Sequence, residues 1–202
     1  MFRLMVVTDR AVCRRPLVET VKAALDGGAD AVQLRERGME DADLFRLAEE
    51  LRRVTRAADA ALIVNRRVDI ALVVEADGVQ LGYSSLAVGD VRELAGDRLR
   101  IGASCHNRAE LEAAKSAGAD YAILGPVFPT PTKMGLIEPL GVEQFAALAH
   151  AVELHVIAIG GVTPENAARV LNAGAAGLAV IRAVLAAAAP RAASRQLADA
   201  WE

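Results

Sequence analysis

Two segments of the chain carry residue types that could bind a phosphate group. The first is GPVFPTPTKMG, residues 125–135, where Thr130 and Thr132 offer hydroxyls and Lys133 offers a compact positive charge. Hydroxyl and ammonium groups both donate hydrogen bonds to phosphate oxygens. Lysine is rare in this chain, which favours a ligand-binding loop over a surface loop with a solvated lysine. The flanking glycines and prolines could let this loop close over a ligand.

The second segment is VIAIGGVTPEN, residues 156–166, in which Gly160 and Gly161 separate a strand-like run from a helix start. Backbone N–H groups at such a turn can approach an anion closely, and the helix dipole favours negative charge there. The run LAVIR at 178–182 ends the last strand-like segment, at Ile181 and Arg182. A tight strand-to-helix turn also requires glycine, so phosphate binding is one of two interpretations of the glycine pair.

Amide and cationic side chains gather in a third place, the run AVQLRER at 31–37. Gln33, Arg35 and Arg37 alternate along it, so a strand would place all three on one face. Apolar packing gives no reason for these residue types, which favours contact with a ligand. The alternative is a salt bridge inside the fold, for example from Arg35 to Asp9 or Glu36.

The elements that must position these residues alternate along the whole length. Helical stretches carry apolar stripes, as in Leu17, Val21 and Ala24, and the segments GGAD, AGAD and AGAA each place a helix-ending glycine before a strand. The strand-like runs are 4–9, 31–35, 61–65, 78–82, 100–105, 121–127, 156–161 and 177–181. Eight such units predict a parallel (β/α)8 TIM barrel in one domain over residues 1–202.

A barrel of this kind carries its active site at the carboxyl ends of the strands, often with a phosphate site after strands 7 and 8. The rule brings the three segments above to one rim and favours phosphate binding at Gly160 and Gly161. It also selects Asn65, Arg66, Gln80, Ser104 and His106, which end or follow other strands.

Composition excludes several classes of protein. The chain has 202 residues, is 53% hydrophobic and 24% charged, and has a net charge of −3, so it can bury a large core and shows no basic excess for nucleic acid. We expect no membrane span and no signal peptide, and therefore a cytoplasmic protein. Its two cysteines predict neither a metal site nor a disulfide framework. We expect a homo-oligomer, with a dimer favoured, and the Ala-rich segment at 183–193 could serve as the pairing surface.

An ordered series of motifs resembles the thiamine phosphate synthase/TenI family across nearly the whole chain. The motifs are VVTD at 6–9, VQLRER at 32–37, IVNRRVDIAL at 63–72, ADGVQLG at 76–82, GASCH at 102–106, ADYAILGPVFPTPTK at 119–133, AIGGV at 158–162 and GLAVIRA at 177–183. The resemblance implies a (β/α)8 barrel. For the synthase members it implies joining an aminopyrimidine pyrophosphate to a thiazole phosphate, with release of pyrophosphate and a need for Mg²⁺.

The resemblance also assigns residues to the two substrates. The pyrimidine pyrophosphate side comprises Gln33, Arg35, Arg37, Asn65, Ser104 and Lys133. The thiazole phosphate side comprises Thr130, Thr132, Gly160, Gly161, Ile181 and Arg182. This division agrees with the phosphate interpretation reached from residue chemistry.

Two departures from the synthase pattern concern the metal. Where synthases supply Mg²⁺ carboxylates, this chain has Arg66 after Asn65, and Ser85 after the VQLG motif. Mg²⁺ requires hard oxygen ligands, usually with a carboxylate among them, and the charge of Arg66 would repel it. We therefore expect no cofactor, magnesium included.

Other motifs, VQLGYSSL and TKMGLIEPLGV, resemble the TenI branch, whose activity is a metal-free tautomerisation of a thiazole carboxylate phosphate. That branch often has histidine after the glycine of the sixth strand, where this chain has Pro126. A general acid or base must then come from elsewhere. We take His106, Lys133 and Glu36 as the candidate catalytic residues, with Cys105 behind them; His106 could instead cap the helix that follows it.

Three functions fit these observations. The favoured one is a TenI-like protein of thiamine biosynthesis that binds thiazole phosphate and acts as a metal-independent tautomerase. The alternatives are a thiamine phosphate synthase with an altered Mg²⁺ site and a non-catalytic thiazole or thiamine phosphate-binding accessory or regulatory protein. In each case the expected partner is a small-molecule phosphate.

Overall fold

The structure, a computed structural model, describes residues 1–131 and 137–201. Its strands are all parallel and close into a barrel in chain order, with the last strand paired to the first. The strands are β1 (Leu4–Val7), β2 (Ala31–Leu34), β3 (Ala61–Asn65), β4 (Gly78–Leu81), β5 (Arg100–Cys105), β6 (Tyr121–Leu124), β7 (His155–Ile159) and β8 (Gly177–Val180). The predicted (β/α)8 barrel is therefore confirmed.

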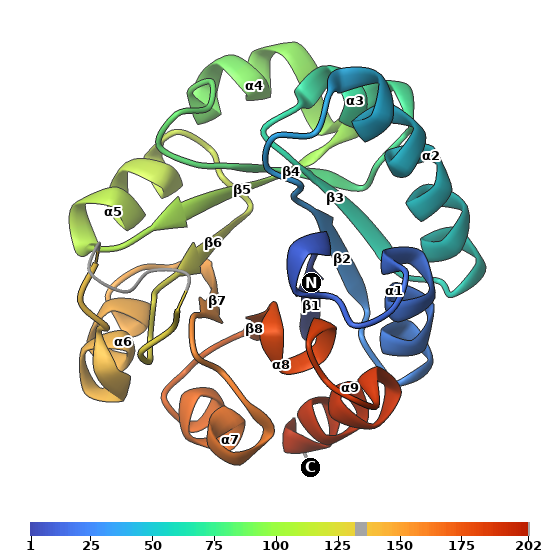
Figure 1. Ribbon diagram of the computed structural model, residues 1–202. Helices are drawn as coiled ribbons and strands as arrows, with labels where there is room; N and C mark the ends of the chain where they lie inside the picture. The colour runs from blue at the N-terminus through green and yellow to red at the C-terminus, as the bar shows by residue number, and fades with distance from the viewer. Residues whose placement is uncertain (132–136, 202) are drawn as a thin grey trace.

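Helices form a ring outside the barrel (Figure 1). They are α1 (Leu17–Asp26), α2 (Asp41–Ala57), α3 (Val68–Val73), α4 (Val88–Ala95), α5 (Arg108–Ser116), α6 (Gly141–His150), α7 (Pro164–Asn172), α8 (Arg182–Leu185) and α9 (Pro190–Ala198). Short 3-10 helices lie at Arg10–Val12, Gly96–Arg98 and Asp199–Trp201. Within the described ranges, every helix is too short or too polar to cross a bilayer.

The core has two parts, one on each side of the barrel wall. Successive side chains of a strand point to opposite faces, so Leu4 and Val6 pack outward under the helices whereas Met5 and Val7 point into the barrel. The inner part also holds Tyr121, whose ring lies edge-on to Phe2 at a centroid distance of 5.6 Å. This inner packing closes the barrel and forms the base of any site at its carboxyl end.

The glycine signals that predicted helix ends act as expected. Gly28, Gly118 and Gly174 adopt φ angles of 102°, 87° and 92°, a region that glycine enters without steric cost. The predicted start of α7 is also confirmed, with Thr163 as N-cap and Pro164 in the first turn.

Several strands end earlier than the sequence pattern predicts, because apolar residues continue into the loops. The clearest case is β6, expected over 121–127, which ends at Leu124. Pro126 has no N–H to donate and interrupts the ladder; pairing with β7 resumes where Val127 N–H donates to Ile159 O at 2.9 Å. The loop after β6 is thereby held against the end of β7.

The C-terminal segment packs on its own chain. Helix α9 lies against α1 and buries Leu197, and α8 buries Val184 and Leu185. Part of the Ala-rich segment that could have served as a pairing surface is therefore used within the chain.

Candidate active site

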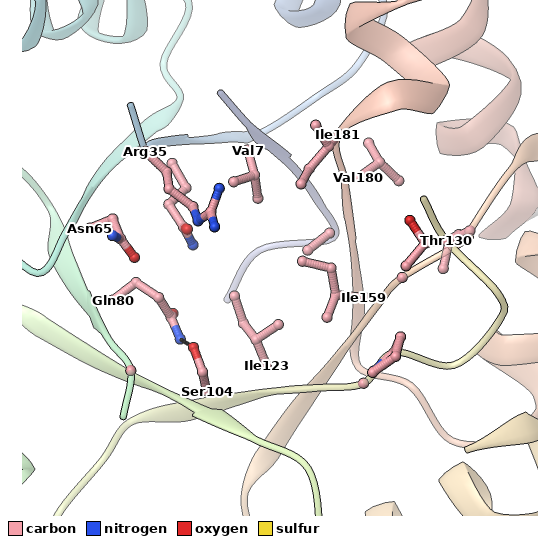
Figure 2. A pocket seen from close by; sticks show the side chains of 18 of the residues that line it. Val7, Arg35, Asn65, Gln80, Ser104, Ile123, Thr130, Ile159, Val180 and Ile181 are labelled. Carbon is pink, nitrogen blue, oxygen red and sulfur yellow. Dashed lines mark hydrogen bonds between the residues drawn. The ribbon is translucent and has the colours of Figure 1, made fainter. Parts of the chain in front are cut away.

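A cavity of about 560 Å³ opens at the carboxyl ends of the strands, within the usual range for small-molecule sites. Its floor is apolar and is made by Val7, Ile123, Ile159, Ala179 and Ile181. Figure 2 shows polar side chains from β2 to β5 on one side of this cavity and Thr130 with Ile159 and Ile181 on the other. The cavity can thus present polar groups to one ligand region and an apolar surface to another.

Strand β2 supplies the first polar residues. Gln33 is buried, with Nε2 3.5 Å from Met5 Sδ. The backbone N–H of Arg35 donates to the buried Thr8 hydroxyl at 2.8 Å, which fixes the chain just after the strand, and its guanidinium points into the cavity (Figure 2).

Arg35 does not form an ion pair with Asp9 or Glu36, which was the alternative to ligand contact. Asp9 accepts the backbone N–H of Ala11 at 3.2 Å, and Glu36 accepts that of Arg10 at 3.1 Å. Burial lowers the pKa of Arg35, and the nearby charge of Arg37 lowers it further. Both effects mean that the arginine charge is held there at a cost in free energy, as expected of a group that awaits an anion.

Strands β3 to β5 supply amide and hydroxyl groups. Asn65 ends β3, and buried Gln80 on β4 donates from Nε2 to Ser104 Oγ on β5 at 3.0 Å. Gln80 Oε1 has no hydrogen-bond partner within the described residues. This amide orients the Ser104 hydroxyl toward the cavity.

The opposite wall holds most of the predicted phosphate-side residues together. Thr130, Gly160, Gly161, Ile181 and Arg182 all line the cavity. Thr132 and Lys133 lie outside the described residues, so their predicted roles remain predictions.

The two glycines have a packing reason in addition to any ligand. Gly160 and Gly161 have φ angles of 96° and 66°, which disfavour other residues. A Cβ on Gly160 would lie 2.5 Å from Pro126 Cβ, and one on Gly161 would lie 2.6 Å from Phe128 Cβ. The loop after β6 therefore lies directly on the turn after β7, and both glycines are required by that contact.

The candidate acids and bases are only partly placed in the cavity. His106 lines it, but its Nδ1 lies 3.1 Å from the Glu110 carboxylate, and Asn107 rather than His106 caps α5. Glu36 does not line this cavity and accepts backbone N–H from Arg10. Burial raises the pKa of the Cys105 thiol to about 12, which keeps it neutral near pH 7.

The residues at the expected metal positions do not fit a magnesium ion. Arg66 donates from its guanidinium to Ser84 O at 3.0 Å, and the Ser85 hydroxyl accepts the N–H of Gly82 at 2.9 Å. In residues 1–131 and 137–201 no group of three His, Cys, Asp or Glu side chains could hold a metal ion. The chemistry of this part of the chain favours an anion over a hard cation.

Sequence reasoning missed some contributors to the cavity. Gln80 was selected by its place at a strand end and lines the cavity, but its bond to Ser104 was not foreseen. Tyr83 and Ser84 line the cavity mouth, and Tyr83 is fully exposed. They lie in the loop after β4, where no periodicity indicates which side chains turn toward the barrel.

Among the described residues, the charged side chains that line the cavity are all arginines. Arg35, Arg37, Arg66 and Arg182 line it, whereas no Asp or Glu among residues 1–131 and 137–201 does. With the apolar floor, this defines the molecule as a (β/α)8 barrel with a cationic small-molecule cavity at its carboxyl rim. The chain belongs to the family described as thiamine monophosphate synthase (TMP-TENI), which it matches over residues 4–184.

Individual relatives agree with this assignment. A thiamine-phosphate synthase of Chloroflexus aurantiacus is 44% identical over 197 residues, covering 97% of this chain and 91% of the relative. A thiamine-phosphate synthase of Moorella thermoacetica is 42% identical over 194 residues, covering 96% of this chain and 92% of the relative. A solved thiamine phosphate pyrophosphorylase from Pyrococcus furiosus superposes with a TM-score of 0.90 at 39% identity, covering 98% of this chain and 94% of the other.

Proposed function

We propose that the protein is an enzyme of thiamine biosynthesis that condenses a pyrimidine diphosphate with a thiazole phosphate, as a thiamine phosphate synthase. The observation that carries this proposal is the cavity wall, which has four arginines and, among the described residues, no carboxylate. Two anionic substrates with flat rings match such a wall above an apolar floor. The sequence alone favoured tautomerisation, and the synthase names of the relatives at 42–44% identity favour the alternative.

The chemistry of condensation suits the groups present. The thiazole nitrogen donates its lone pair to the methylene carbon of the pyrimidine, a C–N bond forms, and the C–O bond to the diphosphate breaks with the electron pair leaving on oxygen. That nitrogen carries no proton, so the bond-forming step requires no general base. Arginines near the leaving group stabilise the charge that develops on it.

Tautomerisation is the second candidate, supported by the arginine and serine at the expected metal positions. It requires a group that moves a proton. Of the described candidates, His106 is in reach of the cavity but is paired with Glu110, and Cys105 is held as a neutral thiol. These placements favour condensation.

Assays of both reactions on one preparation test the proposal. Thiamine phosphate formation is followed by fluorescence of the oxidised product, and tautomerisation by the absorbance of the aromatic thiazole, in parallel with Mg²⁺ and with EDTA. We expect condensation in at least one condition and no tautomerisation above the uncatalysed rate. Tautomerisation without condensation would reverse the assignment, and absence of both would support the accessory-protein alternative.

A further inference from the structure

A second cavity adjoins the first and shares its most cationic residues. It has a volume of about 720 Å³ and lies among the loops after β2, β3 and β4. The residues common to both cavities are Arg35, Arg37, Asn65, Arg66 and Ser84. We call Arg35, Arg37 and Arg66 the arginine junction, because the two cavities meet at these three side chains.

The charges of the arginine junction are not neutralised within the described residues. None of the three makes an ion pair with a carboxylate of residues 1–131 or 137–201, whereas the next arginine, Arg67, pairs with Asp41 and Asp69. The second cavity also contains two carboxylates, but Glu36 accepts the backbone N–H of Arg10 and Asp41 pairs with Arg67. Three like charges held near one another, with no direct ion pair to a described carboxylate, form a site for a multivalent anion.

Arg66 is held in this place by an unusual backbone. Its φ is 65°, a conformation that costs free energy for a residue other than glycine and that concentrates at functional sites. Its N–H donates to Gln80 O at 2.9 Å, and its guanidinium donates to Ser84 O at 3.0 Å. A guanidinium has five N–H donors, so donors remain for a ligand after this one bond.

We propose that Arg66 binds the diphosphate group of the substrate directly, beside Arg35 and Arg37, at the position where synthases supply a metal-binding carboxylate. This rests on the proposed function, which supplies a diphosphate substrate. Two or three guanidinium groups match the two to three negative charges of a diphosphate, and their planar forks bind phosphate oxygens in pairs. Diphosphate binding then requires no divalent metal.

Calorimetric titration with inorganic pyrophosphate tests this, in buffer containing EDTA and again in buffer containing Mg²⁺. We expect wild-type binding in EDTA. Arg66→Ala should weaken it roughly 10- to 100-fold, the effect of losing hydrogen bonds to a charged group. Arg66→Lys, which keeps the charge without the fork, should bind with intermediate affinity. Thermal unfolding of each variant shows whether it is folded.

Arg53→Ala is the matched control, because it removes the same charge from the exposed outer side of α2. It should change the affinity less than twofold. Binding that requires Mg²⁺, no binding in either buffer, or equal effects of Arg53→Ala and Arg66→Ala would overturn the inference. A protein that binds pyrophosphate in EDTA but makes no thiamine phosphate in either condition would contradict the proposed function and leave the inference standing.

Discussion

Several observations favour Arg35 as a residue that contacts a ligand. Its guanidinium reaches the cavity, burial and Arg37 lower its pKa, and the two nearest candidate carboxylates bind backbone N–H groups instead. A lowered pKa in a base means that its charged form is less favourable in the folded state than in the unfolded state. The charge of Arg35 therefore does not stabilise the fold, which favours a role in binding.

Replacing Arg35 should separate binding from stability. We expect Arg35→Ala to weaken the binding of pyrophosphate by roughly 10- to 100-fold, the effect of losing charge-assisted hydrogen bonds. The free energy of unfolding should stay within about 1 kcal/mol or rise, because no ion pair is lost. Calorimetry and urea unfolding measure the two effects. An unfolded variant, or a stability loss of several kcal/mol, would instead indicate a structural role.

Many of the individual residues that line the cavity were predictable from the sequence, because of the geometry of a parallel barrel. Parallel strands end at one rim, so choosing polar residues at strand ends located Arg35, Asn65 and Ser104 in the cavity. Interactions of loop side chains were not predictable. The bond from the Arg66 guanidinium to Ser84 O joins two loops that are 18 residues apart in sequence, and no sequence period records that.

At the scale of elements, the contact between the β6 and β7 loops shapes the phosphate side of the cavity. Phe128 N–H donates to Gly160 O at 2.9 Å, and Asn166 Nδ2 on α7 donates to Gly161 O at 2.9 Å. The glycine pair was predicted for its approach to an anion. The structure adds that the turn must also admit the neighbouring loop, a long-range contact that a local motif cannot show.

Gly161→Ala should therefore destabilise the protein. The positive φ and the contact with Phe128 together predict a loss of about 1–3 kcal/mol in the free energy of unfolding. Gly89→Ala is the control: Gly89 lies within α4, and a methyl group added there would meet no atom within 4 Å, so alanine should stabilise by about 0.5–1 kcal/mol. Equal effects of the two changes in urea unfolding would refute the packing argument.

Tyr121 on β6 gives a test of the barrel interior. Its side chain is fully buried, its hydroxyl has no hydrogen-bond partner among the described residues, and burial raises its pKa. Tyr121→Phe keeps the ring against Phe2 and removes an unsatisfied polar group. We expect unchanged stability or a gain of about 1 kcal/mol. A loss above about 1 kcal/mol would show that the hydroxyl has a partner, such as a buried water.

At the scale of the whole molecule, the closed barrel was predictable because every level of the sequence agrees with it. Apolar runs, helical stripes and helix-ending glycines such as Gly28 and Gly174 all indicate the same repeated unit. The second cavity was not predictable, since it arises from the packing of three loops around Arg66.

Global stability should also depend on alkaline pH through the cavity thiol. Burial raises the pKa of Cys105 from 9.0 to about 12, so the folded state keeps a proton that the unfolded state loses. The contribution of this protonated thiol to the free energy of unfolding is fully present below pH 9 and is lost as the pH rises from about 9 to 12. Cys105→Ala should lower the free energy of unfolding at about pH 8.5. Between about pH 8.5 and 10.5, however, urea unfolding should show a smaller loss of stability for this variant than for the wild type. Parallel losses in both proteins would contradict the assignment.

An arginine-walled cavity at the carboxyl rim should bind two phosphorylated groups without a metal. A crystal structure of the protein soaked with thiazole phosphate and pyrophosphate in the presence of Mg²⁺ would show both groups at once. We expect pyrophosphate against Arg35, Arg37 and Arg66, and the thiazole phosphate beside Thr130 and Gly161. A magnesium ion coordinated beside Arg66, or either anion outside the cavity, would refute metal-free binding at this rim.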